Sequence, residues 1–423
     1  MSITVYNLFL LLYRLGMQVI APWNPKAKLW LAGRKDFFEK LRFSIGKSGK
    51  PVIWMHCASL GEFEQGRPLL EAVRMNYPDY RILLTFFSPS GYEVKKNYEG
   101  ADYIFYMPMD NRHNAAKMLE IVNPAIVLWI KYEYWYYYLT AIRDRKIPLL
   151  LVSGIFRPDQ PFFKSYGSLH RKMLASFTHF FVQTNDSKNL LNSVGISQQV
   201  TVSGDTRFDR VVQIADNFSS LPVIENFCGN DPVIVAGSTW PDDEEELDHY
   251  ANTHPHIKFI IAPHEIYEEH LKEIEKLFHA SIRYSQLANK NPQIISDPQT
   301  PNVLIIDNIG MLSRLYKYAT ITYIGGGFGD DGVHNVLEAA VYAKPVVFGP
   351  EYDKYVEAIE LVENGAAFPV EQALELEQTM NRLLNNKCDY DKACKAAGNY
   401  VHENKGATKK IMNYIQANRL LTN

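Results

Sequence analysis

The residues with the clearest chemical potential lie in a glycine-rich stretch towards the C-terminal end of the chain. A short apolar run, Ile321–Ile324, precedes five glycines between positions 325 and 332, and helical composition follows over Asn335–Ala343. Bare backbone between the carboxyl end of a strand and the start of a helix is where α/β proteins bind anionic ligands. Glu338, about one turn into the expected helix, can accept hydrogen bonds from two vicinal hydroxyls, as on a ribose. The pattern predicts a nucleotide site, although a tight turn that needs glycines only for packing would look the same.

A second candidate is a carboxylate behind the first apolar strand. Val52–Met55 predicts a buried strand, and a helix is expected from Gly61 to Arg74. Glu62 therefore lies at the mouth of a strand–helix loop, a common place for a general base. An acid that only complements the positive end of the helix would occupy the same place, so both roles stay open.

Five sequence blocks resemble those of the 3-deoxy-D-manno-octulosonic acid (Kdo) transferases in order and spacing. They are Trp54–Glu62, Val202–Asp209, Ile261–His264, Asp307–Met311 and Gly325–Pro350. Each block is moderately specific, and together they cover nearly the whole chain. The resemblance implies an α/β protein of the GT-B class, with two Rossmann-like parallel-sheet domains facing a cleft. An N-terminal membrane-associating helix is expected in addition, on the evidence of the N-terminal residues themselves.

The resemblance also implies a reaction. It points to an inverting, metal-independent glycosyltransferase that moves Kdo from CMP-Kdo to the lipid A precursor (lipid IVA) in the lipopolysaccharide biosynthesis of Gram-negative bacteria. No cofactor is implied besides the donor substrate CMP-Kdo. Glu62 matches the family's general base. Arg207 stands where the family has lysine and keeps a cation for a carboxylate or phosphate.

The segment Ile130–Trp135 departs most from the family pattern E-T-E-L-W-P-N. Glu133 matches the second glutamate, whereas Lys131 replaces the first, which is implicated in stabilising the transition state. Either Glu133 takes over that role, or Lys131 helps to bind the anionic sugar or acceptor, and the sequence does not decide between them. The tyrosines that follow equally fit aromatic packing at a helix start.

The other blocks imply that CMP binds in the C-terminal half. The residues expected to line this site are Pro263, His264, Ile309, Gly310, Met311, Gly326, Gly327, Asn335, Val336, Leu337 and Glu338. His264 and Met311 replace an arginine and a glutamate of the family. We therefore expect the contacts to CMP to depend more on backbone, on Asn335 and on Glu338.

No divalent metal is expected. The acidic run Asp242–Glu246 follows a predicted strand and Pro241, and acids are favourable at a helix start, where consecutive carboxylates diverge. The second histidine of a zinc-protease motif is missing after His264. The four cysteines show no C-x-x-C spacing and suggest reduced thiols.

The N-terminal region predicts contact with a membrane. Ile3–Trp23 is mostly apolar, interrupted by Asn7 and Arg14, and lacks the features of a signal peptide. Residues 1–50 carry nine Lys and Arg against two acidic residues, a net charge of +7. We expect this region to attach to the anionic membrane surface on the cytoplasmic side of the inner membrane, spanning it or lying on it. An amphipathic helix packed on the N-terminal domain is the alternative.

Alternation of strands and helices predicts parallel sheets in more than one domain. The expected organisation is a membrane-associating segment (1–24), an N-terminal acceptor-binding domain (25–213), a linker (214–231), a C-terminal nucleotide-sugar-binding domain (232–390) and C-terminal helices that could cross back to the first domain (391–423). A net charge of −3 argues against nucleic-acid binding.

Two other functions remain open. Another GT-B nucleotide-sugar transferase or epimerase would share the fold and the glycine loop, but would not need both the Ser59–Glu62 block and the membrane-seeking N-terminus. A non-catalytic GT-B scaffold would explain Lys131 and His264. The presence of Glu62, Arg207 and Glu338 speaks against a scaffold.

Overall fold

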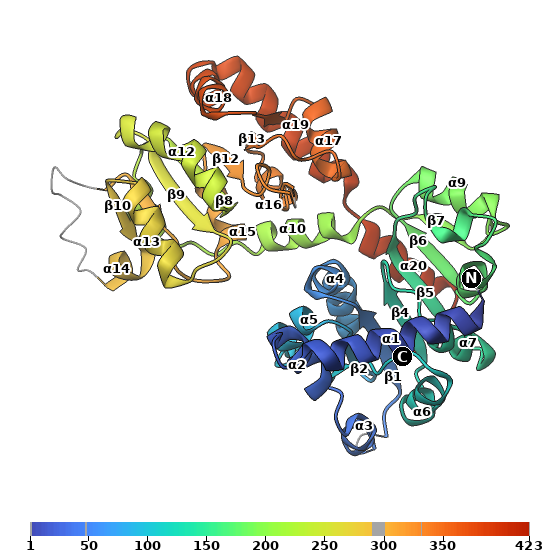
Figure 1. Ribbon diagram of the computed structural model, residues 1–423. Coiled ribbons are helices and arrows are strands. Elements are labelled where there is room, and N and C mark those ends of the chain that lie inside the picture. Colours follow the sequence, from blue (N-terminus) through green and yellow to red (C-terminus); the bar gives the residue numbers. More distant parts are fainter. Residues whose placement is uncertain (1, 47–48, 290–300, 331, 423) are drawn as a thin grey trace. The chain divides into compact units, whose positions relative to one another are not determined.

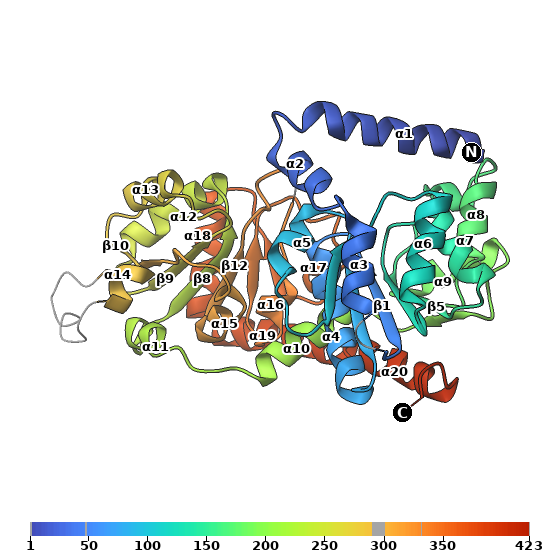
Figure 2. The ribbon, with the colours of Figure 1, turned by 90° about the horizontal axis from the view of Figure 1, so that it is seen from below.

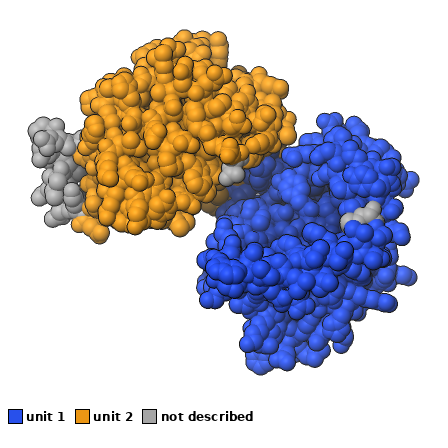
Figure 3. Space-filling model, viewed as in Figure 1, with its two compact units in different colours: residues 1–210, 405–423 blue, residues 211–404 orange. Residues whose placement is uncertain are grey.

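Two compact units make up the protein, as seen in the computed structural model, which describes residues 2–46, 49–289, 301–330 and 332–422 (Figures 1 and 3). Unit 1 comprises residues 1–210 and 405–423, and unit 2 comprises residues 211–404. The chain leaves unit 1 within helix α10 (Thr206–Asp216) and returns after α19 (Lys387–Asn404). The segment interpreted as a linker, 214–231, holds the end of α10 and helix α11 (Pro222–Cys228).

Seven parallel strands form the sheet of unit 1, in the order β3-β2-β1-β4-β5-β6-β7. They are β1 (Val52–Cys57), β2 (Arg81–Phe86), β3 (Tyr103–Tyr106), β4 (Ile126–Ile130), β5 (Leu149–Gly154), β6 (His179–Val182) and β7 (Val200–Val202). Alternate residues of β1 enter different cores: Val52 and Trp54 join one apolar cluster, and Ile53 and Met55 join the other. Because both faces of the sheet are covered, its strands are continuous apolar runs.

The helices of unit 1 include one from the far end of the chain. They are α1 (Ile3–Ile20), α2 (Pro25–Ala32), α3 (Phe37–Ile45), α4 (Leu60–Asn76), α5 (Pro89–Lys95), α6 (Arg112–Val122), α7 (Tyr136–Asp144), α8 (Ser168–Leu174), α9 (Asn185–Ser193) and α20 (Ala407–Ala417). Ile411 and Ile415 of α20 are fully buried in the same core as Leu69 of α4. The Asp209 carboxylate accepts hydrogen bonds from the N–H groups of Gly406 and Thr408 and so fixes the start of α20.

The sheet of unit 2 is also parallel and seven-stranded, in the order β10-β11-β9-β8-β12-β13-β14. Its strands are β8 (Val233–Thr239), β9 (Lys258–Pro263), β10 (Ser281–Arg283), β11 (Val303–Ile305), β12 (Ile321–Ile324), β13 (Val346–Phe348) and β14 (Ala367–Pro369). The remaining helices are α12 (Pro241–Thr253), α13 (Glu268–Leu277), α14 (Tyr284–Asn289), α15 (Leu312–Leu315), α16 (Leu337–Ala340), α17 (Val356–Glu363) and α18 (Ala373–Asn385).

Each sheet has a central point where the order of strands reverses, and the sheet of unit 2 has a further change of order at its edge, where β11 lies between β9 and β10. In unit 1 this point lies between β1 and β4, and in unit 2 it lies between β8 and β12. Ligands of open α/β sheets bind outside the carboxyl ends of the strands at such a point. Glu62 follows β1, Lys131 and Glu133 follow β4, and the glycine stretch follows β12. The topology therefore places both predicted sites at switch points.

Helix α1 lies along the outside of unit 1 (Figures 1 and 2). Tyr6 and Leu10 are buried against the unit, whereas nine large apolar side chains on the rest of the helix are exposed. Within the described part of the chain, α1 is the one helix long and apolar enough to cross a membrane by length and composition. Its packing agrees with an amphipathic helix on the N-terminal unit, and its outer face is apolar.

Candidate active site

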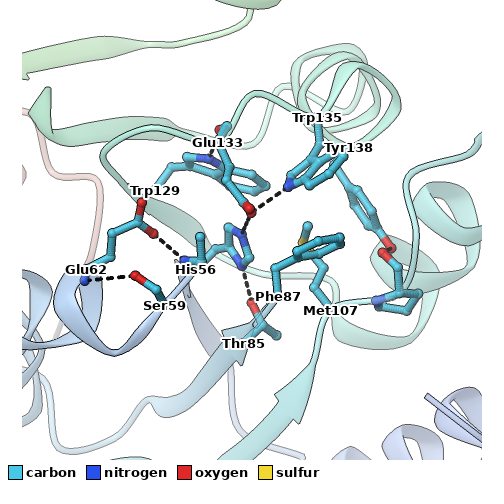
Figure 4. Close-up of polar contacts among 12 residues, drawn as sticks. His56, Ser59, Glu62, Thr85, Phe87, Met107, Trp129, Glu133, Trp135 and Tyr138 are labelled. Atoms are coloured by element: carbon cyan, nitrogen blue, oxygen red, sulfur yellow. Dashed lines mark hydrogen bonds and ion pairs between the residues drawn. The ribbon is translucent and has the colours of Figure 1, made fainter. Parts of the chain in front are cut away.

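Glu62 sits in the first turn of α4, immediately outside the end of β1 (Figure 4). The hydroxyl of Ser59 caps this helix and accepts a hydrogen bond from the Glu62 N–H at 3.5 Å. The Glu62 carboxylate turns back and accepts hydrogen bonds from the backbone N–H groups of Ala58 and Tyr132. Its side chain is thereby tied to the segments that follow both β1 and β4.

The environment of Glu62 suits a proton acceptor. Burial raises the pKa of its carboxyl, the negative charge of Glu133 raises it further, and the two backbone hydrogen bonds and Lys131 offset part of the rise, so that the pKa is about 7. A general base is most effective when its pKa lies near the working pH. An acid that only complemented a helix dipole would have a lowered pKa. The raised pKa of Glu62 therefore differs from what a purely structural acid at a helix start would show.

Glu133 is held by a network of buried and half-buried aromatic and polar side chains (Figure 4). Its Oε2 accepts a hydrogen bond from Trp135 Nε1 at 2.8 Å and lies 3.3 Å from His56 Nε2, while its backbone carbonyl accepts from Trp129 Nε1 at 2.6 Å. On the other side of the His56 ring, Nδ1 lies 2.9 Å from Thr85 Oγ1. If the Thr85 hydroxyl donates to Nδ1, neutral His56 carries its proton on Nε2 and donates it to Glu133.

Lys131 and Arg207 lie close to a buried carboxylate that the sequence did not single out, Asp205. Arg207 donates from Nε to Asp205 Oδ2 at 2.8 Å, and Gln65 donates from Nε2 to Oδ1 at 2.6 Å. Burial alone would raise the pKa of the Asp205 carboxyl, but the charges of Arg207 and Lys131 and these hydrogen bonds hold it below its usual range. The structure thus brings together all four residues that the sequence proposed for catalysis: Glu62, Lys131, Glu133 and Arg207.

Lys131 has a backbone conformation that is rare for a residue with a side chain. Its φ of 56° lies in the left-handed region, directly after β4. Such a conformation costs on the order of 1–3 kcal/mol and persists where the surrounding structure enforces it, often at functional sites. Its Nζ lies 4.7 Å from the centre of the Tyr132 ring. The sequence carries no local signal for this conformation. His56 was also not singled out, because it is a polar residue inside an otherwise apolar strand.

In unit 2 the residue after β8, Trp240, was also missed. Its ring stacks on the ring of His264 at 4.6 Å, and His264 stacks on His334 at 4.6 Å. Trp240 Nε1 donates to His334 Nε2 at 3.0 Å, so His334 carries its proton on Nδ1 when neutral. Pro263 ends β9 and His264 follows it. Three ring systems from three loops therefore meet outside the carboxyl ends of β8, β9 and β12.

Close backbone packing explains the glycines at 325–327. A Cβ on Gly325 would lie 2.3 Å from the Ser238 carbonyl oxygen, one on Gly326 would lie 2.6 Å from the Gly332 carbonyl oxygen, and one on Gly327 would lie 2.6 Å from the Gly349 nitrogen. The Gly326 N–H donates to Asp243 Oδ2 at 2.8 Å. Packing thus requires these glycines, and the Gly326 N–H already has an acceptor within the protein.

The expected helix over Asn335–Ala343 is wrong in length. Helix α16 spans only Leu337–Ala340, after Val336, and Glu338 lies in its first turn rather than one turn further. The chain turns sharply because Ala343 has a φ of 54° and the proline at 345 disfavours helix at the preceding residue. Glu338 nevertheless remains beside Asn335, whose Nδ2 donates to Glu338 Oε1 at 3.0 Å.

The remaining candidates for the nucleotide site lie after β11. Ile309 is 88% exposed and Gly310 has a φ of 96°, whereas Met311 is buried at the start of α15. The chain then returns to β8. Tyr316 and Leu312 pack directly on Gly237 of β8, in the space where a Cβ on this glycine would lie. Met311 is therefore linked to the switch point, and Ile309 projects into solvent.

The acidic run begins α12, which confirms its interpretation as a helix start. Asp243 accepts hydrogen bonds from Trp240 N, Gly326 N and the Tyr323 hydroxyl. Glu244 pairs with Thr239 and His270. Within the described ranges, no group of three or more His, Cys, Asp or Glu side chains is arranged to hold a metal ion.

Comparison with known proteins identifies a domain within the chain. Residues 35–210 match the family model for the 3-deoxy-D-manno-octulosonic-acid transferases (Kdo transferases). The chain therefore carries a Kdo transferase domain, and it is similar to Kdo transferases over most of its length. It is 27% identical to the transferase of Aquifex aeolicus over 84% of the chain and 91% of that protein, and 23% identical to that of Haemophilus influenzae over 93% and 92%. It is accordingly a glycosyltransferase.

One relative is longer. The chain is 26% identical to a bifunctional glycosyltransferase/methyltransferase of Fusobacterium nucleatum over 79% of the chain, but it spans only 53% of that protein. Among solved structures, the UDP-GlcNAc 2-epimerase of Neisseria meningitidis bound to UDP-GlcNAc has a TM-score of 0.63 at 18% identity, over 86% of this chain and 100% of that one. This likeness concerns the fold alone, and with the two parallel sheets it confirms the α/β GT-B class.

Proposed function

We propose that this Kdo transferase moves Kdo from CMP-Kdo to the lipid A precursor, with inversion at the anomeric carbon, without a metal ion and with Glu62 as general base. The observation that carries the proposal is the buried carboxylate of Glu62, whose pKa is about 7, at the switch point of unit 1. The Kdo transferase domain and the similarity to Kdo transferases support the donor and the type of acceptor.

The reaction is a single displacement. The Glu62 carboxylate takes the proton of an acceptor hydroxyl, and that oxygen forms a bond to the anomeric carbon of Kdo as the bond from this carbon to the CMP phosphate oxygen breaks. CMP leaves with the bonding electrons, and Glu62 later releases the proton to solvent. One displacement from the side opposite the leaving group inverts the configuration.

The cations of unit 1 fit the charges in this reaction. The positive charge of Lys131 interacts with both Glu62 and Asp205 and lowers the pKa of each carboxyl group. Arg207 is fixed on Asp205 by its Nε. We assign the two cations to the anionic groups of the donor or acceptor, because charge-assisted hydrogen bonds to carboxylate and phosphate are the strong ones. Glu133, held by His56 and Trp135, takes the role of the second family glutamate.

In unit 2 the proposal places CMP at the carboxyl ends of β8, β9 and β12. Glu338, oriented by Asn335, would bind the ribose hydroxyls. Asn335 Oδ1 is buried and has no hydrogen-bond partner among the described residues, so it is available to a donor group of the ligand. His264 is exposed and supplies a ring N–H where the family has arginine.

We place the protein on the cytoplasmic face of the inner membrane, with α1 lying in the interface. Tyr6 and Leu10 are buried in unit 1, and a helix that keeps these contacts cannot also cross the bilayer. The outer face exposes Leu8, Leu12 and Val19, with Trp23 just beyond the helix. Behind α1, a cavity of about 730 Å³ is lined by cationic side chains, namely Arg14, Arg34, Lys35 and Lys117, together with two acidic ones, Asp36 and Glu39.

The test is turnover of CMP-Kdo with the lipid A precursor in vesicles, followed by CMP release, product mass and the anomeric configuration by NMR. Glu62→Gln keeps the shape and removes the base, and should lower turnover by about 10²–10⁴ with CMP-Kdo binding retained. Activity should survive EDTA. A folded Glu62→Gln variant with wild-type turnover, or a retained configuration, would contradict the mechanism.

The same experiment tests the alternative function, that of another GT-B nucleotide-sugar enzyme such as an epimerase. Wild-type protein incubated with UDP-GlcNAc instead of CMP-Kdo should leave it unchanged. Conversion of UDP-GlcNAc, together with no turnover of CMP-Kdo, would favour an epimerase over a Kdo transferase.

A further inference from the structure

A buried carboxylate joins α1 to the segment that carries Glu133. Asp110, 1% exposed, lies in the loop after β3. Its Oδ1 accepts a hydrogen bond from Tyr138 N at 3.0 Å, and its Oδ2 accepts from Tyr137 N at 2.9 Å and from the Tyr6 hydroxyl at 2.6 Å. Tyr6 comes from α1, more than 100 residues away in the sequence.

The Tyr6 hydroxyl also completes the cap of α7. It accepts a hydrogen bond from Tyr136 N at 3.2 Å while it donates to Asp110. The first three N–H groups of α7 thus find their acceptors on Tyr6 and Asp110, whereas the residue at the N-cap, Trp135, makes no capping hydrogen bond with its side chain. Helices usually satisfy these groups with a neighbouring Ser, Thr, Asp or Asn. Here α1 supplies part of the cap.

The start of α7 is connected to Glu133 of the candidate active site through a short segment of chain. Only two residues separate Glu133 from Tyr136, and one of them, Trp135, donates to the Glu133 carboxylate. The Trp135 ring packs on Phe87 at 4.7 Å. A shift of the first turn of α7 would therefore move Trp135 and, with it, the oxygen that faces His56 (Figure 4).

We propose that Tyr6, with Asp110, is a positioning residue for the segment Lys131–Trp135, so that α1 is part of the active-site architecture and not only a membrane anchor. The inference rests on the proposed function for its catalytic consequence. It predicts that loss of the Tyr6 hydroxyl slows the chemical step even for an acceptor without acyl chains. A helix that only anchored the protein would matter for lipid acceptors alone.

The variant Tyr6→Phe removes the hydroxyl and keeps the ring. Tyr13→Phe is the matched control: it is the same substitution on the inner side of the same helix, and the Tyr13 hydroxyl has no hydrogen bond to any described residue, its ring packing on Trp30 and Phe87. Both are assayed for kcat and KM with the lipid A precursor and with its deacylated, water-soluble form. Hydrogen exchange of the peptide covering residues 131–139 is followed in parallel.

We expect Tyr6→Phe to lower kcat about 10- to 100-fold on both acceptors, with KM for CMP-Kdo little changed, because small displacements of reacting groups cost this much. Exchange at residues 136–138 should accelerate, and Tyr13→Phe should stay within about twofold of wild type in both measurements. Asp110→Asn, which places N–H donors against N–H donors, should act in the same direction as Tyr6→Phe.

Equal kcat for the two tyrosine variants, or a loss confined to the acylated acceptor, would overturn the inference while leaving the proposed function intact. If the wild type itself fails to turn over CMP-Kdo, the proposed function fails. Hydrogen exchange then remains as the test of the positioning contact. Faster exchange in Tyr6→Phe than in Tyr13→Phe would then support the positioning contact, and equal exchange would refute it.

Discussion

The carboxylate of Glu133 acts on that of Glu62 across the carboxyl ends of the neighbouring strands β4 and β1. Its negative charge adds to the effect of burial and raises the pKa of Glu62 to about 7. Two neighbouring carboxylates in different surroundings can have different roles in one reaction. In this chain His56 and Trp135 hold Glu133, and under the proposed function Glu62 is the group that exchanges a proton.

The first prediction concerns the pH dependence of catalysis. A base must be ionised, so kcat/KM should rise with pH up to about 7 and level off above it. Glu133→Gln removes a charge that raises the Glu62 pKa, and the inflection should move to lower pH. The exposed acid Glu120 offers a control, since Glu120→Gln should leave the inflection in place. An inflection that does not move in Glu133→Gln would contradict the coupling.

The second prediction concerns stability. Between the ordinary Glu pKa of 4.5 and about 7, the folded state binds a proton at Glu62 that the unfolded state has lost, so the free energy of unfolding falls as pH rises through this window. Glu62→Gln removes this penalty. Urea unfolding should show the variant more stable than wild type by up to about 3 kcal/mol at pH 8, with little difference from this source at pH 4. A variant no more stable at pH 8 than at pH 4, relative to wild type, would show that the pKa is not raised.

Much of this fold was predictable because buried parallel strands are short apolar runs. β12 begins and ends where the sequence placed it, at Ile321 and Ile324, and β1 begins at the predicted Val52 but continues past Met55 to Cys57. The missed strand, β10 (Ser281–Arg283), is a three-residue edge strand with two polar residues, and it has no apolar run to reveal it. Helix α16 was expected too long because composition does not show that Ala343 adopts a left-handed conformation.

The candidate site was predictable only where family motifs marked it. Glu62, Lys131, Glu133 and Arg207 lie together as their motifs implied, but Asp205, the carboxylate on which the charges of Arg207 and Lys131 both act, was not singled out. Contacts between distant segments, such as that of Tyr6 with Asp110, follow from tertiary packing and have no local signal. Trp240 was missed for the same reason, since its contacts are to rings contributed by two other loops.

The third prediction concerns CMP. Glu338→Ala should weaken CMP binding by about 1–3 kcal/mol, because a carboxylate that accepts hydrogen bonds from ribose hydroxyls is lost. Glu338→Gln keeps the shape and should weaken binding less. Glu363→Ala, at an exposed position of the same unit, is the control. Calorimetric titration gives the affinities, and a Glu338→Ala variant that binds CMP as the control does would remove Glu338 from the site.

The last prediction concerns the membrane. Deleting α1 would also remove Tyr6 from the cap of α7, so substitutions on the outer face of the helix are more informative. Leu8, Leu12 and Leu15 are between 46% and 58% exposed and lie on one face of α1. Replacing all three by serine should lower binding to phosphatidylglycerol vesicles at least about tenfold, because burial of a leucine contributes roughly 1.5–3 kcal/mol.

The matched control replaces three apolar residues elsewhere that are even more exposed, Met75, Val94 and Leu374, by serine. It should sediment with vesicles as the wild type does. In the α1 variant the remaining attraction comes from basic residues, contributes about 1 kcal/mol for each well-placed Lys or Arg, and should fall with added salt. KM for the lipid acceptor should rise while affinity for CMP stays the same. If the α1 variant sediments like the control at both low and high salt, α1 is a packed helix only and the membrane-binding surface lies elsewhere.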